Sequence, residues 1–255
     1  MNMFSKGPRC RYGQPQLAEV ICQLRFPEIL TIQANAPADF QEVIRGQFPL
    51  YLRRQELPVS AVGGKNEPVI NHQFATADGV WRVNLTSKFI SLTCSSYRCW
   101  EDFAAHLDRP LVAFLKTYNP APFERIGLRY LNFISRNQLG LEGTPFSELI
   151  QPCYLGLLSQ EDVAESAVSR STVDYEAAIR GGCRVKLHAG PGKIKRGVKE
   201  DPEIKFIFDQ DLYMNGPVPH NLVPGALQTL HSQADSIFRG AITQKLHEAM
   251  EPEIL

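Results

Sequence analysis

Apolar and polar residues alternate along several short segments of the chain, and apolar residues recur at helical spacing in others. The alternation predicts strands at 17–26, 69–76, 80–86, 89–94, 123–135, 182–190 and 203–214. The helical spacing predicts helices at 37–48, 100–118 and 224–249, with a short one at 144–150. The segments around Gly63-Gly64 and at 191–201 are predicted to be loops, and 162–177 is rich in β-forming residues. The pattern is typical of an α+β protein.

The order strand, short helix, several strands and long helix occurs twice, at about 17–119 and 123–250. Aligning QLRF (23–26) with GLRY (127–130) places Leu24 on Leu128 and Arg25 on Arg129. We therefore expect one domain over 1–255 with two pseudo-repeats, as in a helix-grip or TATA-binding-protein-like saddle. Helices would cover one face of the sheet and leave the other open. The alternative is an α+β domain whose element order repeats by coincidence.

The overall charge of the chain is balanced, with 27 basic and 27 acidic side chains among 255 residues. This balance argues against a globally basic nucleic-acid binder and leaves a segregated basic face open. No segment approaches the length of uncharged apolar sequence that a membrane span needs. The N-terminal segment lacks the apolar core of a signal peptide, so we expect a cytoplasmic protein with no membrane partner.

No motif in the chain predicts a catalytic residue, a metal site or a cofactor. The six cysteines are scattered without a Cys-x-x-Cys pair and are expected to be free thiols in a reducing compartment. The histidines show no H-E-x-x-H spacing, and the Gly-Lys of 191–201 is not followed by Ser or Thr as a P-loop requires. The sequence therefore favours a protein that is not an enzyme.

The strand phase opposite the apolar one is rich in basic residues and, in the predicted strands, poor in carboxylates. Guanidinium and ammonium groups gathered on one open sheet face suit the recognition of phosphate or carboxylate groups. The alternative is an ordinary solvated strand face, or arginines paired with carboxylates from loops. The candidate binding residues are Arg25, Arg82, Arg125, Arg129, Arg184, Lys186 and His188.

His231, Asp235 and Arg239 are spaced four residues apart on the last predicted helix and so share one face. A His–Asp pair can orient an imidazole for base catalysis. The alternatives are a solvated stripe or a hydrogen-bonded anchor between helix and sheet. Because no Ser or Cys nucleophile can be placed beside the pair, we interpret His231 and Asp235 as a helix anchor.

Several strings along the chain resemble a bacterial protein family. They are PQLAEVICQLRF (15–26), FISLTCSSYRCWEDF (89–103), GLRYLN (127–132) and LHSQADSIFRGAIT (230–243). Together they resemble a sporadically distributed, uncharacterised bacterial family whose members have about this length. The resemblance implies a fold more than an activity. The patchy distribution implies an accessory role, such as phage defence or a toxin–antitoxin-like module.

Three functional hypotheses follow from the sequence. The first is a binding module whose basic sheet face meets an anionic partner, either a nucleic acid or a protein. The second is an enzyme or sensor that acts on a small anionic metabolite held by the arginines. The third is a protein–protein scaffold, including a homodimer, that uses the sheet edge or the N-terminal arm.

Overall fold

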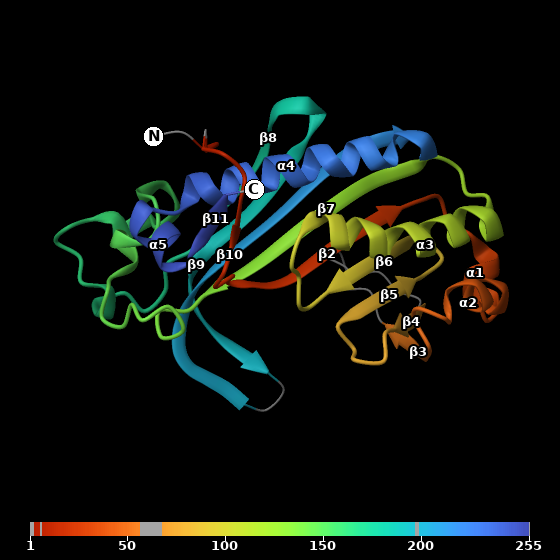
Figure 1. Cartoon of the computed structure of the whole chain (residues 1–255), viewed down its shortest axis with the longest axis horizontal. Helices are drawn as coiled ribbons and strands as arrows, with labels where there is room; N and C mark the ends of the chain where they lie inside the picture. Colours follow the sequence, from red (N-terminus) through yellow and green to blue (C-terminus); the bar gives the residue numbers. More distant parts are fainter. Residues whose placement is uncertain (1–2, 6, 57–67, 197–198, 255) are drawn as a thin grey trace. The chain divides into compact units, whose positions relative to one another are not determined.

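The chain is an α+β protein with a large antiparallel sheet and a few helices, which confirms the predicted class (Figure 1). A computed structural model describes residues 3–5, 7–56, 68–196 and 199–254. The predicted turn at Gly63-Gly64 lies outside these residues. The chain divides into two compact units, neither of which is one continuous stretch. Unit 1 comprises Met1–Ala18, Arg129–Tyr213 and Gln228–Leu255, and unit 2 comprises Glu19–Leu128 and Met214–Leu227.

Unit 2 is an antiparallel meander with helices packed on one of its faces. Its strands lie in the order β3-β4-β5-β6-β2, followed by the first half of β7. The elements are β2 (Leu17–Arg25), α1 (Leu30–Ala34), α2 (Ala38–Ile44), β3 (Leu50–Glu56), β4 (Val69–Ala75), β5 (Trp81–Leu85), β6 (Phe89–Cys94), α3 (Trp100–Tyr118), β7 (Phe123–Ile134) and the short 3-10 helix η6 (His220–Leu222).

The core of unit 2 lies between α3 and one phase of the strands. Phe103 of α3 lies 5.7 Å from the ring of Trp81, and Phe114 lies 4.7 Å from the ring of Phe26. Burial alternates along β2 as the sequence predicts, with Cys22 buried and Arg25 exposed. Each buried aromatic side chain contributes about 1.5–3 kcal/mol by leaving water.

Unit 1 combines the second half of β7 with the long strands β9 and β10, the shorter β8, several 3-10 turns and the C-terminal helices. Its sheet has the order β7-β10-β9-β8, and the two terminal segments form a separate pair, β1 with β11. The elements are β1 (Cys10–Tyr12), η1 (Phe146–Glu148), η2 (Pro152–Tyr154), η3 (Gly156–Ser159), η4 (Glu165–Ala167), β8 (Val173–Ala178), η5 (Arg180–Gly182), β9 (Arg184–Arg196), β10 (Lys199–Val218), α4 (Val223–Ala241), α5 (Gln244–Ala249) and β11 (Pro252–Ile254).

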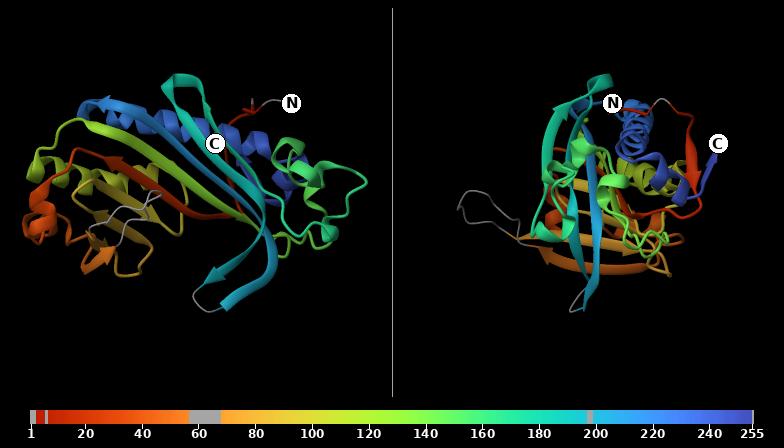
Figure 2. Two further views of the ribbon diagram at one scale, coloured as in Figure 1. Left: turned by 180° about the vertical axis from the view of Figure 1, so that it is seen from behind. Right: turned by 90° about the vertical axis from the view of Figure 1, so that its left-hand side faces the viewer.

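One phase of the unit 1 strands packs beneath α4. Phe208 of β10 lies 5.9 Å from Phe238 of α4 and 5.3 Å from Tyr154 of η2. The opposite phase faces away from α4, and Figure 2 shows these strands from behind with α4 on their far side. Alternation therefore gives the sheet of unit 1 one face that is buried under α4 and a second face that points away from α4.

The predicted loop at 191–201 is wrong, because β9 continues to Arg196 and β10 already begins at Lys199. Lys193 and Lys195 on β9 both contact Glu200 of β10, at 3.0 and 3.3 Å. These cross-strand ion pairs and the backbone ladder form a two-stranded arm in a segment without apolar alternation.

The predicted helix at 224–249 consists of two helices that are separated at Ile242 and Thr243. Ile242 pairs with Ile150 in an isolated bridge, so its backbone leaves the helical path. Thr243 then caps α5, since its side chain accepts a hydrogen bond from the amide of Leu246. The predicted helix at 144–150 is only the 3-10 turn η1.

Within the described part of the chain, no helix is both long and apolar enough to cross a bilayer.

Candidate binding face

The face of unit 1 that points away from α4 carries charges of alternating sign from strand to strand. The residues of this charged face are Arg129 on β7, Asp209 and Asp211 on β10, Arg184, Lys186 and His188 on β9, and Asp174 and Glu176 on β8. His188 lies in register with both Asp174 and Asp209, and Lys186 with both Glu176 and Asp211. Each of these two β9 cationic positions thus has an acidic residue on either side.

Arg129 forms the tightest ion pair of the charged face. Its Nε donates to Asp209 Oδ1 at 2.7 Å, and its Nη2 donates to Oδ2 at 2.5 Å. This two-point contact fixes the plane of the guanidinium more firmly than a single bond would. Arg129 remains 44% exposed while Asp209 is 18% exposed, so the cation is the outer member of the pair.

Glu176 joins three groups at the other edge of the charged face. It contacts Arg184 at 3.2 Å and Lys186 at 3.6 Å, and it accepts a short hydrogen bond from the Tyr213 hydroxyl. The Tyr213 hydroxyl and the two cations lower the pKa of Glu176, and the same hydroxyl and carboxylate raise the pKa of Arg184. Both groups are therefore charged at neutral pH.

His188 is oriented by Asp174, whose Oδ1 lies 2.6 Å from its Nδ1. A carboxylate accepts hydrogen bonds, so Nδ1 is the donor and Nε2 is the acceptor in the neutral ring. The imidazole is 42% exposed. This pair can take up a proton at Nε2 or present one when the ring is charged.

These side chains surround a shallow hollow of about 510 Å³, which lies wholly within unit 1. Its lining includes Arg129, Lys186 and His188, three of the residues that the sequence singled out. Arg184 stands beside it through its contact with Glu176. The structure thus brings together four of the seven predicted binding residues.

The sequence predicts few carboxylates on this face, and this prediction is wrong. Asp209 and Asp211 alternate with the buried Phe206 and Phe208 along β10, so both carboxylates lie on the open side. Asp174 and Glu176 were missed because 162–177 showed no clear alternation, and only its end forms β8. The face is mixed in charge, and strand partners rather than loops supply the carboxylates.

The remaining predicted binding residues lie in unit 2. Arg25 is exposed at the end of β2, and Arg82 on β5 lies 3.5 Å from Glu19. Arg125 is half-buried, and its guanidinium lies over Gly127, where a Cβ atom would be 2.3 Å from Nη1. The glycine two residues after Arg125 therefore makes room for the arginine.

No protein-family model matches the chain, and no curated protein matches it either. The resemblance to the sporadically distributed bacterial family therefore stays a prediction.

His231 and Asp235 lie on α4, away from the charged face. His231 is buried, and its Nδ1 lies 2.8 Å from the Tyr130 hydroxyl, which joins α4 to β7. Asp235 accepts two hydrogen bonds from Arg239, at 3.1 and 2.8 Å. His231 therefore joins two elements of unit 1, whereas the pair of Asp235 and Arg239 lies within α4.

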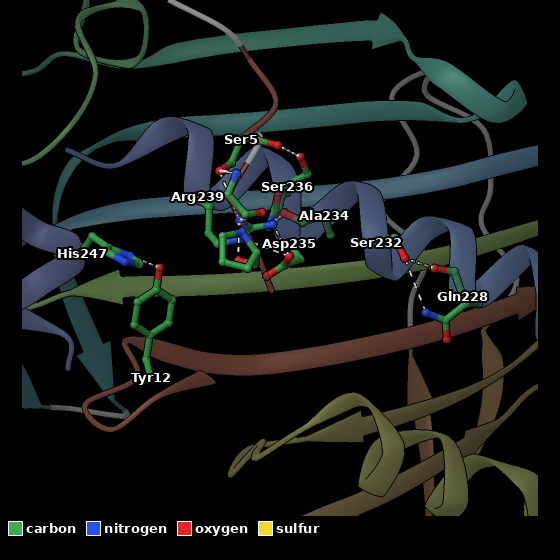
Figure 3. Close-up of polar contacts among 12 residues, drawn as sticks. Ser5, Tyr12, Gln228, Ser232, Ala234, Asp235, Ser236, Arg239 and His247 are labelled. Carbon is green, nitrogen blue, oxygen red and sulfur yellow. Dashed lines mark hydrogen bonds and ion pairs between the residues drawn. The ribbon is translucent and has the colours of Figure 1, made fainter. Parts of the chain in front are cut away.

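Arg239 extends this contact to the N-terminal segment, as Figure 3 shows. Its Nη1 donates to Ser5 Oγ at 3.1 Å and to the carbonyls of Gly7 and Pro8 at 2.8 and 3.0 Å. The Tyr12 hydroxyl lies 2.9 Å from His247 Nδ1. Ser5 and the residues from Gly7 to Tyr12 thus form an N-terminal arm that contacts both C-terminal helices.

The cysteines form no disulfide, and all six are free thiols. Complete burial raises the pKa of Cys22 to about 12, so this thiol is unreactive at neutral pH. Among the described residues, no group of three His, Cys, Asp or Glu side chains is arranged to hold a metal ion.

Proposed function

We propose that the chain is a binding module that recognises an anionic group of a partner protein at the charged face of unit 1. One observation supports this proposal. Arg129, Lys186 and His188 line one hollow, and each lies against a carboxylate of a neighbouring strand. These carboxylates orient the cationic side chains before the partner arrives, which lowers the entropic cost of binding.

The alternation of charge favours a protein over a nucleic acid as the partner. Four carboxylates, those of Asp174, Glu176, Asp209 and Asp211, lie on the same face and repel phosphate groups. A protein surface presents both signs of charge, so it can pair with the basic strand and with its acidic neighbours together. Such a contact requires the charge patterns of the two surfaces to be aligned, and its affinity falls as salt screens the charges.

Fluorescence anisotropy with labelled peptides and oligonucleotides tests the proposal. The probes are a peptide of alternating Asp and Lys, an all-Asp peptide, an all-Lys peptide, and single-stranded RNA and DNA. The test variant combines Lys186→Gln with His188→Gln, and Arg45→Gln is the control because Arg45 is exposed on the surface of unit 2.

The alternating peptide should bind best at low salt and lose affinity about tenfold in the double variant, with no change in the control. Tighter binding of RNA or DNA than of any peptide would replace the protein partner with a nucleic acid. Equal binding by the wild type and the double variant would remove the charged face from the function.

Arg25, Arg82 and Arg125 are proposed as anion-binding residues of unit 2. Arg82 is 44% exposed, and Arg25 is exposed, so both can reach a ligand. Alanine at Arg25 should weaken binding less than the loss of Lys186, because Lys186 lines the hollow of the charged face and Arg25 does not.

An enzyme or sensor for a small anionic metabolite is the second candidate, and the Asp174–His188 pair favours it. The pair lies in the hollow beside Lys186, where a proton acceptor and a cation could act on one ligand. A thermal-shift screen of nucleotides and carboxylic acids would separate the two candidates. Stabilisation that His188→Gln abolishes and Lys245→Gln leaves intact would favour the metabolite.

We also infer that the two halves of the chain arose by duplication. In each half the first strand neighbours the last strand of the meander, β2 beside β6 and β7 beside β10. A long helix follows that last strand in both, α3 after β6 and α4 after β10. The single domain with pseudo-repeats at about 17–119 and 123–250, and the saddle, stay predictions that an experimental structure would test.

The resemblance to a patchily distributed family supports a cytoplasmic accessory role for this module, in phage defence or beside a toxin. A homodimer is the competing partner arrangement, and light scattering after size exclusion would reveal it.

A further inference from the structure

A second hollow of unit 1, of about 600 Å³, shares no lining residue with the charged face. It lies between the irregular segment that contains η4 and the arm formed by β9 and β10. Leu158, Val168 and Ile204 supply apolar surface, and Arg136, Arg170 and Lys193 supply cationic groups. Glu165 and three serines, Ser166, Ser169 and Ser171, complete the polar part of the lining, so apolar surface and charged groups lie side by side in this hollow.

Ile204 adds exposed apolar surface to this hollow. It continues the strand phase of Phe206 and Phe208, which are fully buried, yet its own side chain is 44% exposed. The alternation of apolar residues at 204, 206 and 208 predicts that Ile204 is buried with the two phenylalanines, and this prediction is wrong. The apolar stripe of β10 therefore runs beyond the part of unit 1 that covers it and reaches the hollow.

The three cationic groups differ in what already holds them. The guanidinium of Arg136 is held in place on one side of the hollow. It contacts Glu165 at 2.8 Å, donates to the Thr144 carbonyl at 2.9 Å and lies 4.0 Å from the Phe146 ring centre. Lys193 lies 3.0 Å from Glu200. Arg170 is exposed, and it forms no ion pair with any residue in the described part of the chain.

We propose that this hollow binds a small organic anion with an apolar body. The body covers Leu158, Val168 and Ile204, and the carboxylate, sulfonate or phosphate group lies against Arg170. Arg136 and Glu165 neutralise each other, so Arg170 supplies the charge that selects the anion. The volume falls within the range of about 300–1,000 Å³ typical of small-molecule sites.

A matched pair of fluorescent probes tests the two halves of this proposal. The anionic probe is 8-anilinonaphthalene-1-sulfonate, and the neutral probe is N-phenyl-1-naphthylamine, which lacks the sulfonate. Each is titrated into the full chain and into Arg170→Gln, Ile204→Ser and the control Lys245→Gln. Lys245 is a suitable control because it is a half-exposed cation of unit 1 that pairs with Glu148, outside the hollow.

Arg170→Gln should lower the affinity for the anionic probe about fivefold and leave the affinity for the neutral probe unchanged, because only the sulfonate contacts the guanidinium. Ile204→Ser should weaken the binding of both probes, and Lys245→Gln should weaken the binding of neither. Decanoate should displace the anionic probe more effectively than decanol does. Equal affinities of the wild type and Arg170→Gln for the anionic probe would overturn the proposal, as would the absence of saturable binding.

Thermal melting of each variant shows whether it is folded. If Ile204→Ser does not fold, the comparison of the two probes on Arg170→Gln still decides the role of charge. The proposal is independent of the charged face, because the Lys186→Gln and His188→Gln double variant should bind both probes as the wild type does.

Discussion

His72 in unit 2 is a buried histidine whose hydrogen bonds identify its neutral form. Its Nε2 lies 3.1 Å from the Ile32 carbonyl, which can only accept, so Nε2 carries the proton. Its Nδ1 lies 3.0 Å from the Tyr51 hydroxyl, which therefore donates. Burial lowers the pKa of His72 from its ordinary value of 6.5, and the charge of Arg53 lowers it further, against an opposing effect of the Ile32 bond.

The lowered pKa of His72 makes stability fall on acidification. The unfolded chain takes up the His72 proton near pH 6.5 while the folded chain still resists it, so stability is lost as pH falls below that value. Urea unfolding of the wild type and His72→Gln at a series of pH values checks this. The wild type should exceed the variant by roughly 1–3 kcal/mol at neutral pH, and the difference should shrink toward pH 5. A difference that stays constant with pH would contradict the assignment.

At the residue scale, alternation predicted the phase of a side chain better than its partners. Arg129, Lys186 and His188 all lie on the phase that the sequence assigned to them. Their partners Asp174 and Glu176 come from β8, and strand pairing alone brings them together. A sequence read one strand at a time contains no information about which strands are neighbours.

The N-terminal arm is the element whose position depends most on one side chain. Arg239 is 9% exposed and connects Asp235 of α4 with Ser5 and the carbonyls of Gly7 and Pro8. The arm then continues into β1, which pairs with β11 at the C-terminus. Few apolar contacts of its own are available to such a short segment, so its hydrogen bonds decide whether it stays docked.

Arg239→Met should release the arm while α4 stays helical. The substitution keeps an unbranched apolar side chain and removes every donor, at a cost of roughly 1–3 kcal/mol. Hydrogen exchange of peptides that cover Gly7–Tyr12 should become faster, and exchange in β10 should not change. Arg98→Met is the control, because Arg98 forms an exposed pair with Asp102. Unchanged exchange at Gly7–Tyr12 would mean that the pairing of β1 with β11 suffices to hold the arm.

The elements that the sequence predicted well are those with strong apolar periodicity. Helix α3 begins at Trp100 and ends at Tyr118 as expected, and β2 and β7 differ from expectation by one residue at most. The strands β1, β3 and β11 are not predicted, because β1 and β11 have only three residues each and the described side chains of β3 are exposed. Strands of this kind are specified by the backbone of a neighbour.

At the scale of the whole molecule, neither compact unit is a continuous piece of chain. Residues of β7 and of β10 belong to both units, since the boundaries fall at Leu128–Arg129 and Tyr213–Met214. Unit 2 takes in 214–227, which follow most of unit 1 in the sequence. A cut between the two predicted pseudo-repeats therefore removes residues from each unit.

Separate expression of 1–128 and 129–255 should give fragments without a cooperative thermal transition. The first fragment lacks 214–227 of unit 2, and the second lacks 1–18 of unit 1. Circular dichroism melting of each fragment, and of the two mixed, measures this, with the full chain as the control. A cooperative transition in 1–128 alone would show that the first pseudo-repeat folds independently.

The sequence by itself determined the α+β class, the long elements and the phase of each strong strand, because burial of apolar side chains at fixed periods leaves a direct signature. Tertiary structure alone decided which carboxylates β8 adds to the open face, the exposed position of Ile204 and the break after α4. Each of these depends on residues distant in the sequence. Strand β8 pairs with β9, and Ile150 pairs with Ile242. The part of unit 1 that covers Phe206 and Phe208 leaves Ile204 exposed. Local periodicity records how much of a residue is buried, and only the folded chain settles which residue it meets.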